Sequence, residues 1–236
     1  MTSMRLGKFL AQSGVASRRD AERLIASGVV AVNGVVVTTP VYFVNDGDRV
    51  TVNAKDIKPD QKIRIFAFHK PINTMTTTRD PDGRRTIYDV LGAEYKNLRY
   101  VGRLDFKTTG LLLLTNNGDV ARQLTLPGNE IPRCYLARVA NVRAANLDAA
   151  RRGMTVDGIK YRPMQIDVVD NHTLRVIVTE GKKNEVRHVL AAIGAPVLKL
   201  HRVSYGNIDL GDLKPGKIYE LDQKSIDAIM KSLYNR

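Results

Sequence analysis

The first apolar residues of the chain recur with the spacing of a helix. Leu6, Phe9 and Leu10 fall on one face of a helix predicted over residues 5–12, and the polar residues between them fall on the other face. Gly14 follows directly and is expected to end this helix. The pattern therefore predicts a short amphipathic helix that buries one face.

A second helix is predicted after Ser17. Asp20 stands three residues later, which is the spacing of a capping box, and Gly28 is expected to end the helix. The face expected to be buried consists of Ala21, Leu24 and Ile25. Two consecutive short helices thus open the chain.

A hairpin is predicted next. Valine-rich stretches at residues 29–32 and 35–37 flank Asn33-Gly34, the dipeptide that most strongly favours a two-residue hairpin turn. A further strand is expected at residues 49–52. Residues 1–55 are therefore expected to form one small domain.

The remaining chain alternates between strand and helix patterns. Residues 56–61 include a proline and no periodic apolar position, which is typical of a linker, and residues 62–236 are expected to form a second domain. Strands are predicted at residues 63–70, 111–114, 134–140, 165–169, 174–178, 196–203 and 218–221. Helices are predicted after Thr86, at residues 120–124, 144–152 and 185–193, and at the carboxyl terminus. Because strands dominate and no regular βαβ repeat is visible, the predicted class is α+β with a mixed, mainly antiparallel sheet.

The composition excludes several classes of protein. Cys134 is the only cysteine of the 236 residues, so an internal disulfide or a cysteine-based zinc cluster is excluded and a reducing cytoplasm is the expected location. No apolar run approaches the roughly 18 residues that a membrane span needs. Arg5 and Lys8 interrupt the first apolar positions, so no signal peptide is expected.

Two common kinds of catalytic site also lack support. The four histidines are too scattered to indicate a metal site: they are His69, His172, His188 and His201. No serine lies in the elbow-like context of a catalytic triad. We therefore expect neither a metal site nor a catalytic triad.

The net charge of +13 and the pI near 9.9 favour a polyanionic partner. A generally basic protein without such a partner is equally consistent with composition alone, so the position of the charges has to decide. Three arginines gather on the second predicted helix: Arg18, Arg19 and Arg23. This clustering favours a nucleic acid, although a solvated helix face with incidental arginines is the alternative.

A single carboxylate stands out in the second domain. Asp105 lies in a turn-like run between two apolar segments, with Arg103 and Lys107 on either side. Gly102 and Gly110 bracket the run, so its backbone can bend and a partner can approach closely. Chemistry is often found at the edge of a buried strand, but an ordinary loop salt bridge is found there as well. The run alone does not separate these interpretations.

The amino-terminal segment resembles the alpha-L RNA-binding domain found in a ribosomal small-subunit protein. The resemblance covers about residues 4–53, and Ser17-Arg18-Arg19-Asp20-Ala21-Glu22 and Val32-Asn33-Gly34 carry it. It implies that Arg18, Arg19 and Arg23 contact RNA phosphates, which positions the RNA without reading its sequence.

Three polar runs at strand ends together resemble the signature regions of the RsuA family of ribosomal-RNA pseudouridine synthases. The most specific begins Gly102-Arg103-Leu104-Asp105 and continues through Thr108-Thr109-Gly110 to Thr115. The second contains Tyr135, and the third comprises Glu180-Gly181-Lys182 with Val186-Arg187. His69-Lys70-Pro71 and Leu213-x-Pro215-Gly216 match flanking strands, so the resemblance spans nearly the whole chain.

The resemblance implies an isomerisation of uridine to pseudouridine without a cofactor. Asp105 would be the essential carboxylate, held against the sugar as nucleophile or base. Arg187 would keep it ionised in a desolvated pocket, and Tyr135 would hold the detached base and transfer a proton. Each assignment has a structural alternative. Tyr135 is then only a half-buried aromatic residue of a strand, and Arg187 is a solvated residue of a helix.

The RNA contacts implied by the resemblance involve basic residues. Arg103 could occupy the place that the target base leaves in its stack. Lys70, Lys182 and Lys183 are expected to contact RNA rather than to act in catalysis. The chain departs from the family pattern at His69, Arg133, Lys183 and Asn184, which leaves the detailed RNA contacts and the chosen uridine open. A loop at residues 74–85 could close over substrate or could be an ordinary surface loop.

The sequence therefore predicts a cytoplasmic enzyme that acts on ribosomal RNA, either free or in an assembling subunit. We expect a monomer, although the sequence carries no sign of the oligomeric state. Two alternatives stay open at this point. One is a non-catalytic RNA-binding or ribosome-assembly factor, against which the set of Asp105, Tyr135 and Arg187 argues. The other is a nucleoside hydrolase, which would not explain the basic first domain.

Overall fold

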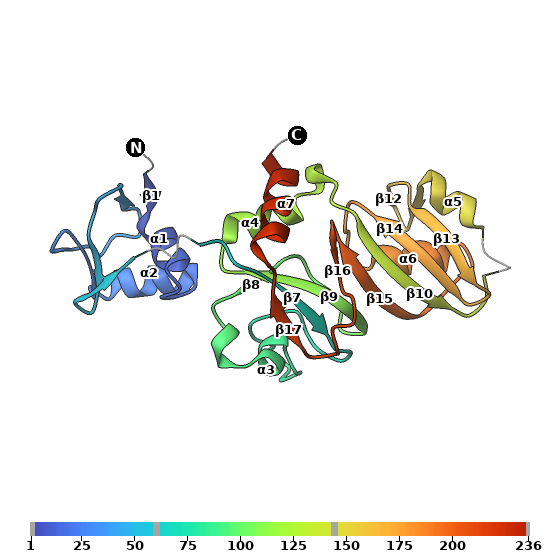
Figure 1. Cartoon of the computed structure of the whole chain (residues 1–236), viewed down its shortest axis with the longest axis horizontal. Coiled ribbons are helices and arrows are strands. Elements are labelled where there is room, and N and C mark those ends of the chain that lie inside the picture. The colour runs from blue at the N-terminus through green and yellow to red at the C-terminus, as the bar shows by residue number, and fades with distance from the viewer. Residues whose placement is uncertain (1–2, 59–61, 143–145, 235–236) are drawn as a thin grey trace. The chain divides into compact units, whose positions relative to one another are not determined.

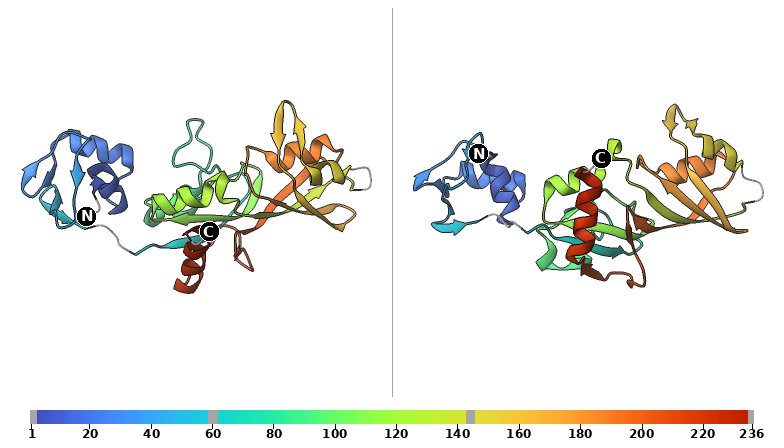
Figure 2. Two further views of the ribbon diagram at one scale, coloured as in Figure 1. Left: turned by 90° about the horizontal axis from the view of Figure 1, so that it is seen from above. Right: turned by 45° about the horizontal axis from the view of Figure 1, so that its top comes forward.

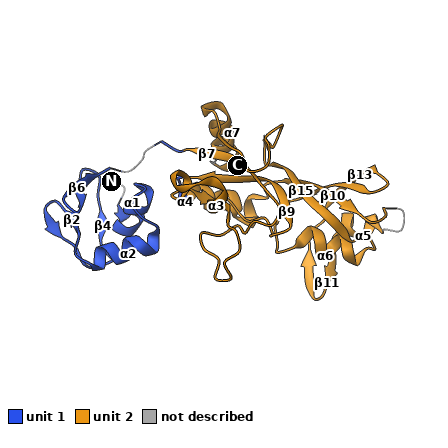
Figure 3. Cartoon of the chain, turned by 90° about the horizontal axis from the view of Figure 1, so that it is seen from below, with its two compact units in different colours: residues 1–63, 116–118 blue, residues 64–115, 119–236 orange. Residues whose placement is uncertain are grey.

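The computed structural model describes residues 3–58, 62–142 and 146–234. The chain divides into two compact units, residues 1–63 with 116–118 and residues 64–115 with 119–236 (Figure 3). None of the helices in the described residues is long and apolar enough to cross a membrane.

The two helices of the first unit form as predicted. Helix α1 (Leu6–Gln12) buries one face, and α2 (Arg18–Ala26) follows it. The Ser17 hydroxyl caps α2 by accepting a hydrogen bond from the backbone N–H of Asp20, which confirms the predicted cap. The apolar faces of both helices meet the sheet of this unit in a core that includes Leu6, Leu10, Ile25, Val30 and Val50.

The predicted hairpin is also present. Strands β2 (Val30–Val32) and β3 (Val35–Val36) join through Asn33 and Gly34, which both have positive φ as a two-residue turn requires. The antiparallel sheet has the order β3-β2-β5-β6, and a short pair β1-β4 lies beside it. The remaining strands are β1 (Met4–Arg5), β4 (Phe43–Val44), β5 (Val50–Val52) and β6 (Lys55–Ile57).

Strand β6 includes the first two residues of the predicted linker. Asp56 and Ile57 were assigned to a linker at residues 56–61, but they pair with β5, and Arg49 forms a two-pronged salt bridge with Asp56. The hydrogen bonds of a strand thus extend the first unit past the predicted boundary. Residues 59–61 lie outside the described residues.

The second unit is built on a nine-stranded sheet, counted within the described residues (Figure 1). Its main path has the order β13-β14-β10-β15-β9-β7-β17, and only the β15–β9 pair is parallel. This confirms the predicted mixed, mainly antiparallel sheet. The strands are β7 (Ile65–Lys70), β8 (Arg99–Tyr100), β9 (Thr108–Thr115), β10 (Arg133–Val139), β13 (Gln165–Asp170), β14 (Thr173–Val178), β15 (Val197–Tyr205), β16 (Ile208–Asp209) and β17 (Ile218–Glu220).

Helices cover this sheet and form one core with its apolar side chains, among them Phe68, Leu112, Val176 and Val189. The α-helices are α3 (Ile87–Leu91), α4 (Gly118–Thr125), α5 (Leu147–Arg152), α6 (Glu185–Ala192) and α7 (Gln223–Tyr234). Single 3-10 turns occur at η1 (Ala93–Tyr95) and η2 (Pro127–Asn129). Thr86 and Asp89 form a complete capping box at the start of α3. The first residues predicted for α5, 144 and 145, lie outside the described residues.

One hairpin of the second unit was not predicted. Strands β11 (Met154–Val156) and β12 (Ile159–Tyr161) pair across a turn in which Asp157 and Gly158 have positive φ. Asp-Gly is a strong hairpin signal, so this element was readable from the sequence. In Figure 2 the hairpin, helix α6 and the loop between β7 and α3 project from one face of the sheet, and α7 lies on the other face.

One glycine allows the parallel pair to form. Gly110 in β9 lies opposite Arg202 in β15, with a φ of +107°. A Cβ added to Gly110 would lie 2.2 Å from the backbone oxygen of Arg202. Only glycine permits this approach, and what lies against Gly110 is the chain's own backbone.

Candidate active site

Asp105 lies in a tight turn between β8 and β9. The backbone N–H of Thr108 donates to the carbonyl of Asp105 at 2.9 Å, and this bond closes the turn. The buried hydroxyl of Thr76 fixes the turn from the side: it donates to the carbonyl of Leu104 at 2.8 Å and accepts from the N–H of Leu104 at 3.3 Å. The half-buried Asp105 carboxylate is therefore held on a rigid support.

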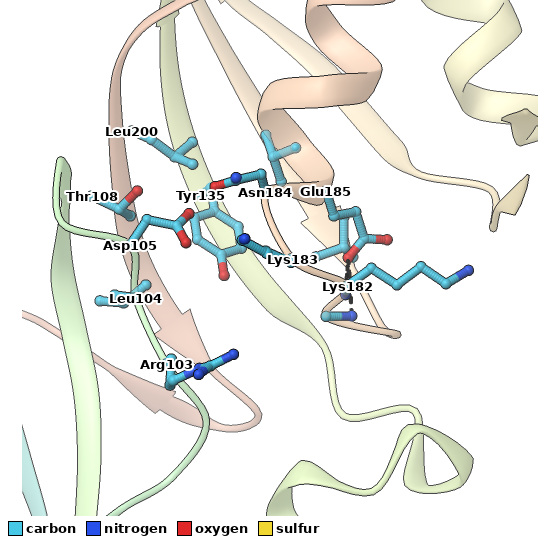
Figure 4. Close-up of a pocket in the computed structure, with 13 residues that line it drawn as sticks. Arg103, Leu104, Asp105, Thr108, Tyr135, Lys182, Lys183, Asn184, Glu185 and Leu200 are labelled. Atoms are coloured by element: carbon cyan, nitrogen blue, oxygen red, sulfur yellow. Dashed lines mark hydrogen bonds between the residues drawn. The ribbon is translucent and has the colours of Figure 1, made fainter. Parts of the chain in front are cut away.

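The carboxylate faces a pocket that gathers residues from all three polar runs (Figure 4). Tyr135 comes from β10, Thr108 from the start of β9, and Asn184 from the segment before α6. Leu200 and Val178 contribute apolar walls. The fold thus brings together an acidic group, an aromatic ring and hydroxyl groups in one partly apolar hollow, as expected for a small-molecule or nucleotide site.

Asn184 is the direct partner of Asp105. With its amide nitrogen facing the carboxylate, Asn184 donates to both oxygens of Asp105, at 2.9 and 3.2 Å. Its backbone has φ 54° and ψ 20°, a left-handed conformation that asparagine tolerates better than most residues. The departure from the family pattern at this position therefore places an amide donor against the carboxylate.

Tyr135 is buried, and a cation lies against it. The guanidinium of Arg202 lies over the ring at 5.9 Å from the centroid, and one of its nitrogens donates to the Tyr135 hydroxyl at 3.4 Å. Arg202 is 2% exposed and anchors itself by donating to the carbonyl of Leu111 at 2.7 Å. The Tyr135 hydroxyl is thus oriented by a buried positive charge that sequence analysis did not identify.

Lys70 is buried beneath the turn and does not lie on the surface. It has no exposed area, and its ammonium donates to the carbonyls of Pro71 and Thr108. The predicted contact of Lys70 with RNA is therefore wrong, because a buried ammonium cannot reach a phosphate. Burial lowers the pKa of Lys70 to about 8, and the negative charge of Asp105 opposes that shift.

Titration of Lys70 gives a stability prediction. Since its folded pKa of about 8 lies below its ordinary value of 10.5, the unfolded chain binds more protons between these values. The free energy of unfolding should therefore gain a rising contribution from pH 8 to pH 10.5. Urea denaturation of the wild type and Lys70→Met across this window measures it. A difference between the two proteins that stays constant with pH would contradict the buried, titrating ammonium.

Arg187 does not contact Asp105. Among the described residues its guanidinium donates to two backbone carbonyls, those of Val197 at 3.2 Å and Lys107 at 3.5 Å. The predicted pairing of Arg187 with Asp105 is therefore not formed, because the start of α6 directs the Asn184 amide at the carboxylate instead. The ammonium of Lys70 and the carboxylate of Asp105 lie near enough for their charges to interact.

Two acidic groups hold the segment before α6. Glu185 is 4% exposed and accepts from the backbone N–H groups of Gly181 and Lys182, at 2.9 and 3.1 Å. Burial and the neighbouring Glu180 raise the pKa of Glu185 to about 7. Glu180 in turn pairs with the ammonium of Lys182 at 2.8 Å. This network fixes the backbone of residues 180–185, the segment of the pocket lining that includes Asn184.

Glu185→Gln should remove a pH dependence of stability. Because the folded pKa of about 7 lies above the ordinary value of 4.5, the folded protein binds more protons between these values. The wild type should therefore lose stability as pH rises from 4.5 through 7, whereas Gln keeps an acceptor and carries no charge. Chemical denaturation of both proteins at several pH values tests this. Parallel stability curves would count against the raised pKa.

The other predicted RNA-binding residues of this unit lie around the pocket. Arg103 and Lys183 are exposed and line its rim. Lys182 also lines it, but its ammonium is held by Glu180, by the carbonyl of Lys160 and over the ring of Tyr161. Arg103 and Lys183 are therefore accessible to solvent at the pocket, whereas the ammonium of Lys182 is held by other parts of the protein.

The three predicted arginines of the first unit are all exposed on α2. Arg23 forms a salt bridge with Asp20 at 3.0 Å. Arg19 and Arg23 lie one helical turn apart, and Arg18 begins the helix. The helix thus presents a basic face to solvent.

Two departures from the family pattern have structural explanations. Arg133 is buried and donates to the carbonyl of Thr179 and the hydroxyl of Tyr205. His69 is buried, and its ring nitrogen lies 2.6 Å from the carbonyl of Leu213. Neither side chain is available to RNA.

Comparisons with known proteins find relatives for both parts of the chain. The model of a family described as RNA pseudouridylate synthase matches residues 64–192, and that of the S4 domain matches residues 4–50. An uncharacterized RNA pseudouridine synthase of Rickettsia felis is 36% identical over 94% of this chain and 99% of its own. A solved pseudouridylate synthase has 26% identity and a TM-score of 0.69, over 96% of this chain and 99% of that chain.

One relative carries a more specific name. The ribosomal large subunit pseudouridine synthase B of Xanthomonas campestris pv. campestris is 36% identical over 97% of this chain. The match covers 49% of that longer protein. Both domains of the present chain therefore have counterparts in proteins named for RNA pseudouridylation.

Proposed function

The chain belongs to the RNA pseudouridylate synthase family, and we propose that it converts a uridine of ribosomal RNA into pseudouridine with Asp105 as the essential carboxylate. The reaction breaks the bond between N1 of uracil and C1′ of the ribose and forms a bond between C5 and C1′. A proton leaves C5 and one is regained at N1, so the product is an isomer. No co-substrate is required by this balance.

Asp105 supplies the group that the first step needs. An ionised carboxylate can act as nucleophile or base toward the sugar. In this half-buried pocket the carboxylate accepts two hydrogen bonds from Asn184, and the buried ammonium of Lys70 lies near enough for the two charges to interact. These contacts support the assignment of Asp105, and Asn184 and Lys70 take the place beside the carboxylate that the resemblance had given to Arg187.

Tyr135 and Thr108 are the groups placed to hold the base. The Tyr135 ring lines the pocket, and its hydroxyl can exchange a proton while Arg202 orients it. The Thr108 hydroxyl is buried, lines the same pocket and has no hydrogen-bond partner among the described residues. A polar edge of the uracil or a ribose hydroxyl would satisfy it.

RNA binding is divided between the two units. The basic face of α2 supplies phosphate contacts that do not depend on sequence, and Arg103 at the rim is placed to fill the gap left when the target base leaves its stack. We propose a monomer acting in the cytoplasm, consistent with a single buried cysteine. The Xanthomonas relative's name supports ribosomal RNA as the substrate.

The observation that carries the proposal is the convergence of Asp105, Tyr135 and Asn184 in one pocket from three separate parts of the chain. A binding protein has no need to hold a carboxylate in a half-buried pocket against an amide donor. The alternative of a non-catalytic assembly factor is disfavoured for this reason.

Mapping of pseudouridines tests the proposal. Ribosomal RNA from cells lacking the protein is compared with RNA from the parent cells and from cells complemented with the wild-type chain. We expect one position or a small set to lose pseudouridine and to regain it on complementation. If every position stays modified in the deletion, the enzymatic proposal is wrong and the assembly-factor alternative takes its place.

A further inference from the structure

A second cavity lies beside the Asp105 pocket. It has a volume of about 740 Å³ and is formed between the end of α5, the β11–β12 hairpin and the segment before α6. That volume lies within the roughly 300–1,000 Å³ typical of ligand sites. None of the roles described above uses this cavity.

The two cavities share a wall. Lys182 lines both of them, Gly181 and Asn184 line the Asp105 side, and Glu180 lines the other side. The Tyr161 hydroxyl lies 3.2 Å from Nδ1 of His188, which ties β12 to α6. The second cavity therefore has a fixed position relative to the reacting carboxylate.

The lining has the composition that a nucleotide needs. Met154 and Pro163 contribute apolar surface, and four cationic side chains line the cavity: Arg152, Lys160, Arg162 and Lys182. Lys182 and Arg162 are already paired, with Glu180 and Glu130 respectively. Apolar surface can contact a base, and cations can contact its phosphate.

Two of these cations have no partner within the part of the chain that the structure describes. Among the described residues, neither the guanidinium of Arg152 nor the ammonium of Lys160 takes part in a hydrogen bond or an ion pair, and both residues are exposed. Arg152 ends α5, and Gly153 next to it has φ +80° and a Cβ position 2.9 Å from the carbonyl of Tyr161. Glycine is thus required for the chain to bring Arg152 to the cavity.

A third cavity adjoins the Asp105 pocket at the loop before α3. It is lined by Thr77, Arg79 and Arg84 of the loop before α3 and also by Asp105 and Asn184. The loop and the β11–β12 hairpin project from the same face of the sheet (Figure 2). A single strand of RNA laid along this face would pass both the loop and the hairpin while its target base occupies the Asp105 pocket.

We propose that the cavity at the β11–β12 hairpin binds the nucleotide next to the target uridine, with its phosphate on Arg152 and Lys160. The inference rests on the proposed function, because the nucleotide bound in this cavity is the neighbour of the target uridine in the same RNA. The hairpin then positions the strand, so that the target ribose meets Asp105. Arg152 and Lys160 act in binding and do not touch the reacting atoms.

The test is the charge reversal R152E/K160E in the full chain. The probe is an in vitro transcribed ribosomal RNA fragment containing the uridine mapped above. We expect the dissociation constant to rise by about tenfold or more, and the slope of its logarithm against log salt to fall by about 1.5.

The matched control is K224E/K231E, which makes the same change of net charge on two exposed lysines of α7. This helix lies on the opposite face of the sheet (Figure 2), so we expect affinity close to wild type. Two trimmed RNAs, ending just before or just after the target uridine, complete the design. One of them should bind R152E/K160E and the wild type equally, which identifies the flank that the cavity holds.

Equal effects of the two double variants would overturn the inference, as would losses that are the same on the full and both trimmed RNAs. These outcomes are separate from a failure of the proposed function. If the proposed function fails, the wild type leaves the fragment unmodified. Fluorescence anisotropy of binding still reports whether the cavity holds RNA.

Discussion

Asp105→Asn is expected to lower turnover on ribosomal RNA by on the order of 10⁴-fold or more, the scale seen when an enzyme loses its reacting group. Asn has nearly the shape of Asp, but it is neither a nucleophile of comparable strength nor a base. The substitution also replaces an acceptor-only group by one that carries an NH₂, although Asn184 can reorient its own amide to accommodate it.

RNA affinity should change little in the Asp105→Asn protein, since the phosphate contacts assigned above lie elsewhere. Single-turnover release of tritium from C5-labelled uridine in RNA, combined with a binding titration, measures both quantities. Complementation of deletion cells gives the same answer in vivo. Full restoration of the modification by Asp105→Asn would show that another group is the essential carboxylate.

Gly110→Ala should produce the largest loss of stability, more than about 4 kcal/mol, because strain and overlap act together. The new Cβ would lie 2.2 Å from the oxygen and 2.6 Å from the nitrogen of Arg202, both backbone atoms, at a φ of +107°. Neither backbone can move without breaking the parallel pairing of β9 with β15. The turn that carries Asp105 leads directly into this strand.

Gly128→Ala is the matched control, since no atom lies within 4 Å of its added Cβ and its φ is not positive. We expect a change within about 0.5 kcal/mol for this variant. Urea denaturation followed by circular dichroism compares the three proteins. Wild-type stability of Gly110→Ala would mean that β9 and β15 do not approach as described.

Local patterns sufficed for much of the first unit. The cap at Ser17, the turn at Asn33-Gly34 and the helix α1 depend on contacts within a few residues, and these are encoded in adjacent positions. The same holds for the turn that carries Asp105, whose closing bond joins it to Thr108. The extension of the first sheet by β6 was missed, because a short polar strand has no apolar alternation to reveal it.

The side-chain partners of Asp105 required the fold. Asn184 and Lys70 come from segments more than a hundred residues apart, and only the packing of α6 and β7 around the turn brings them to the carboxylate. Arg202 was overlooked for a related reason. It occupies an ordinary position in a strand, and its burial against Tyr135 follows from the β10–β15 pairing.

The sequence by itself determined the kind of chemistry, because its three polar runs contain the residue types of the family's signature regions in the same order. It also favoured a polyanionic partner, through the net charge of +13 and the arginines clustered on the second helix. Only the tertiary structure decided which cation acts on Asp105, which lysine is buried and where a second cavity opens. The reason is physical: a motif fixes backbone position within a few residues, whereas the environment of a charge depends on everything packed around it.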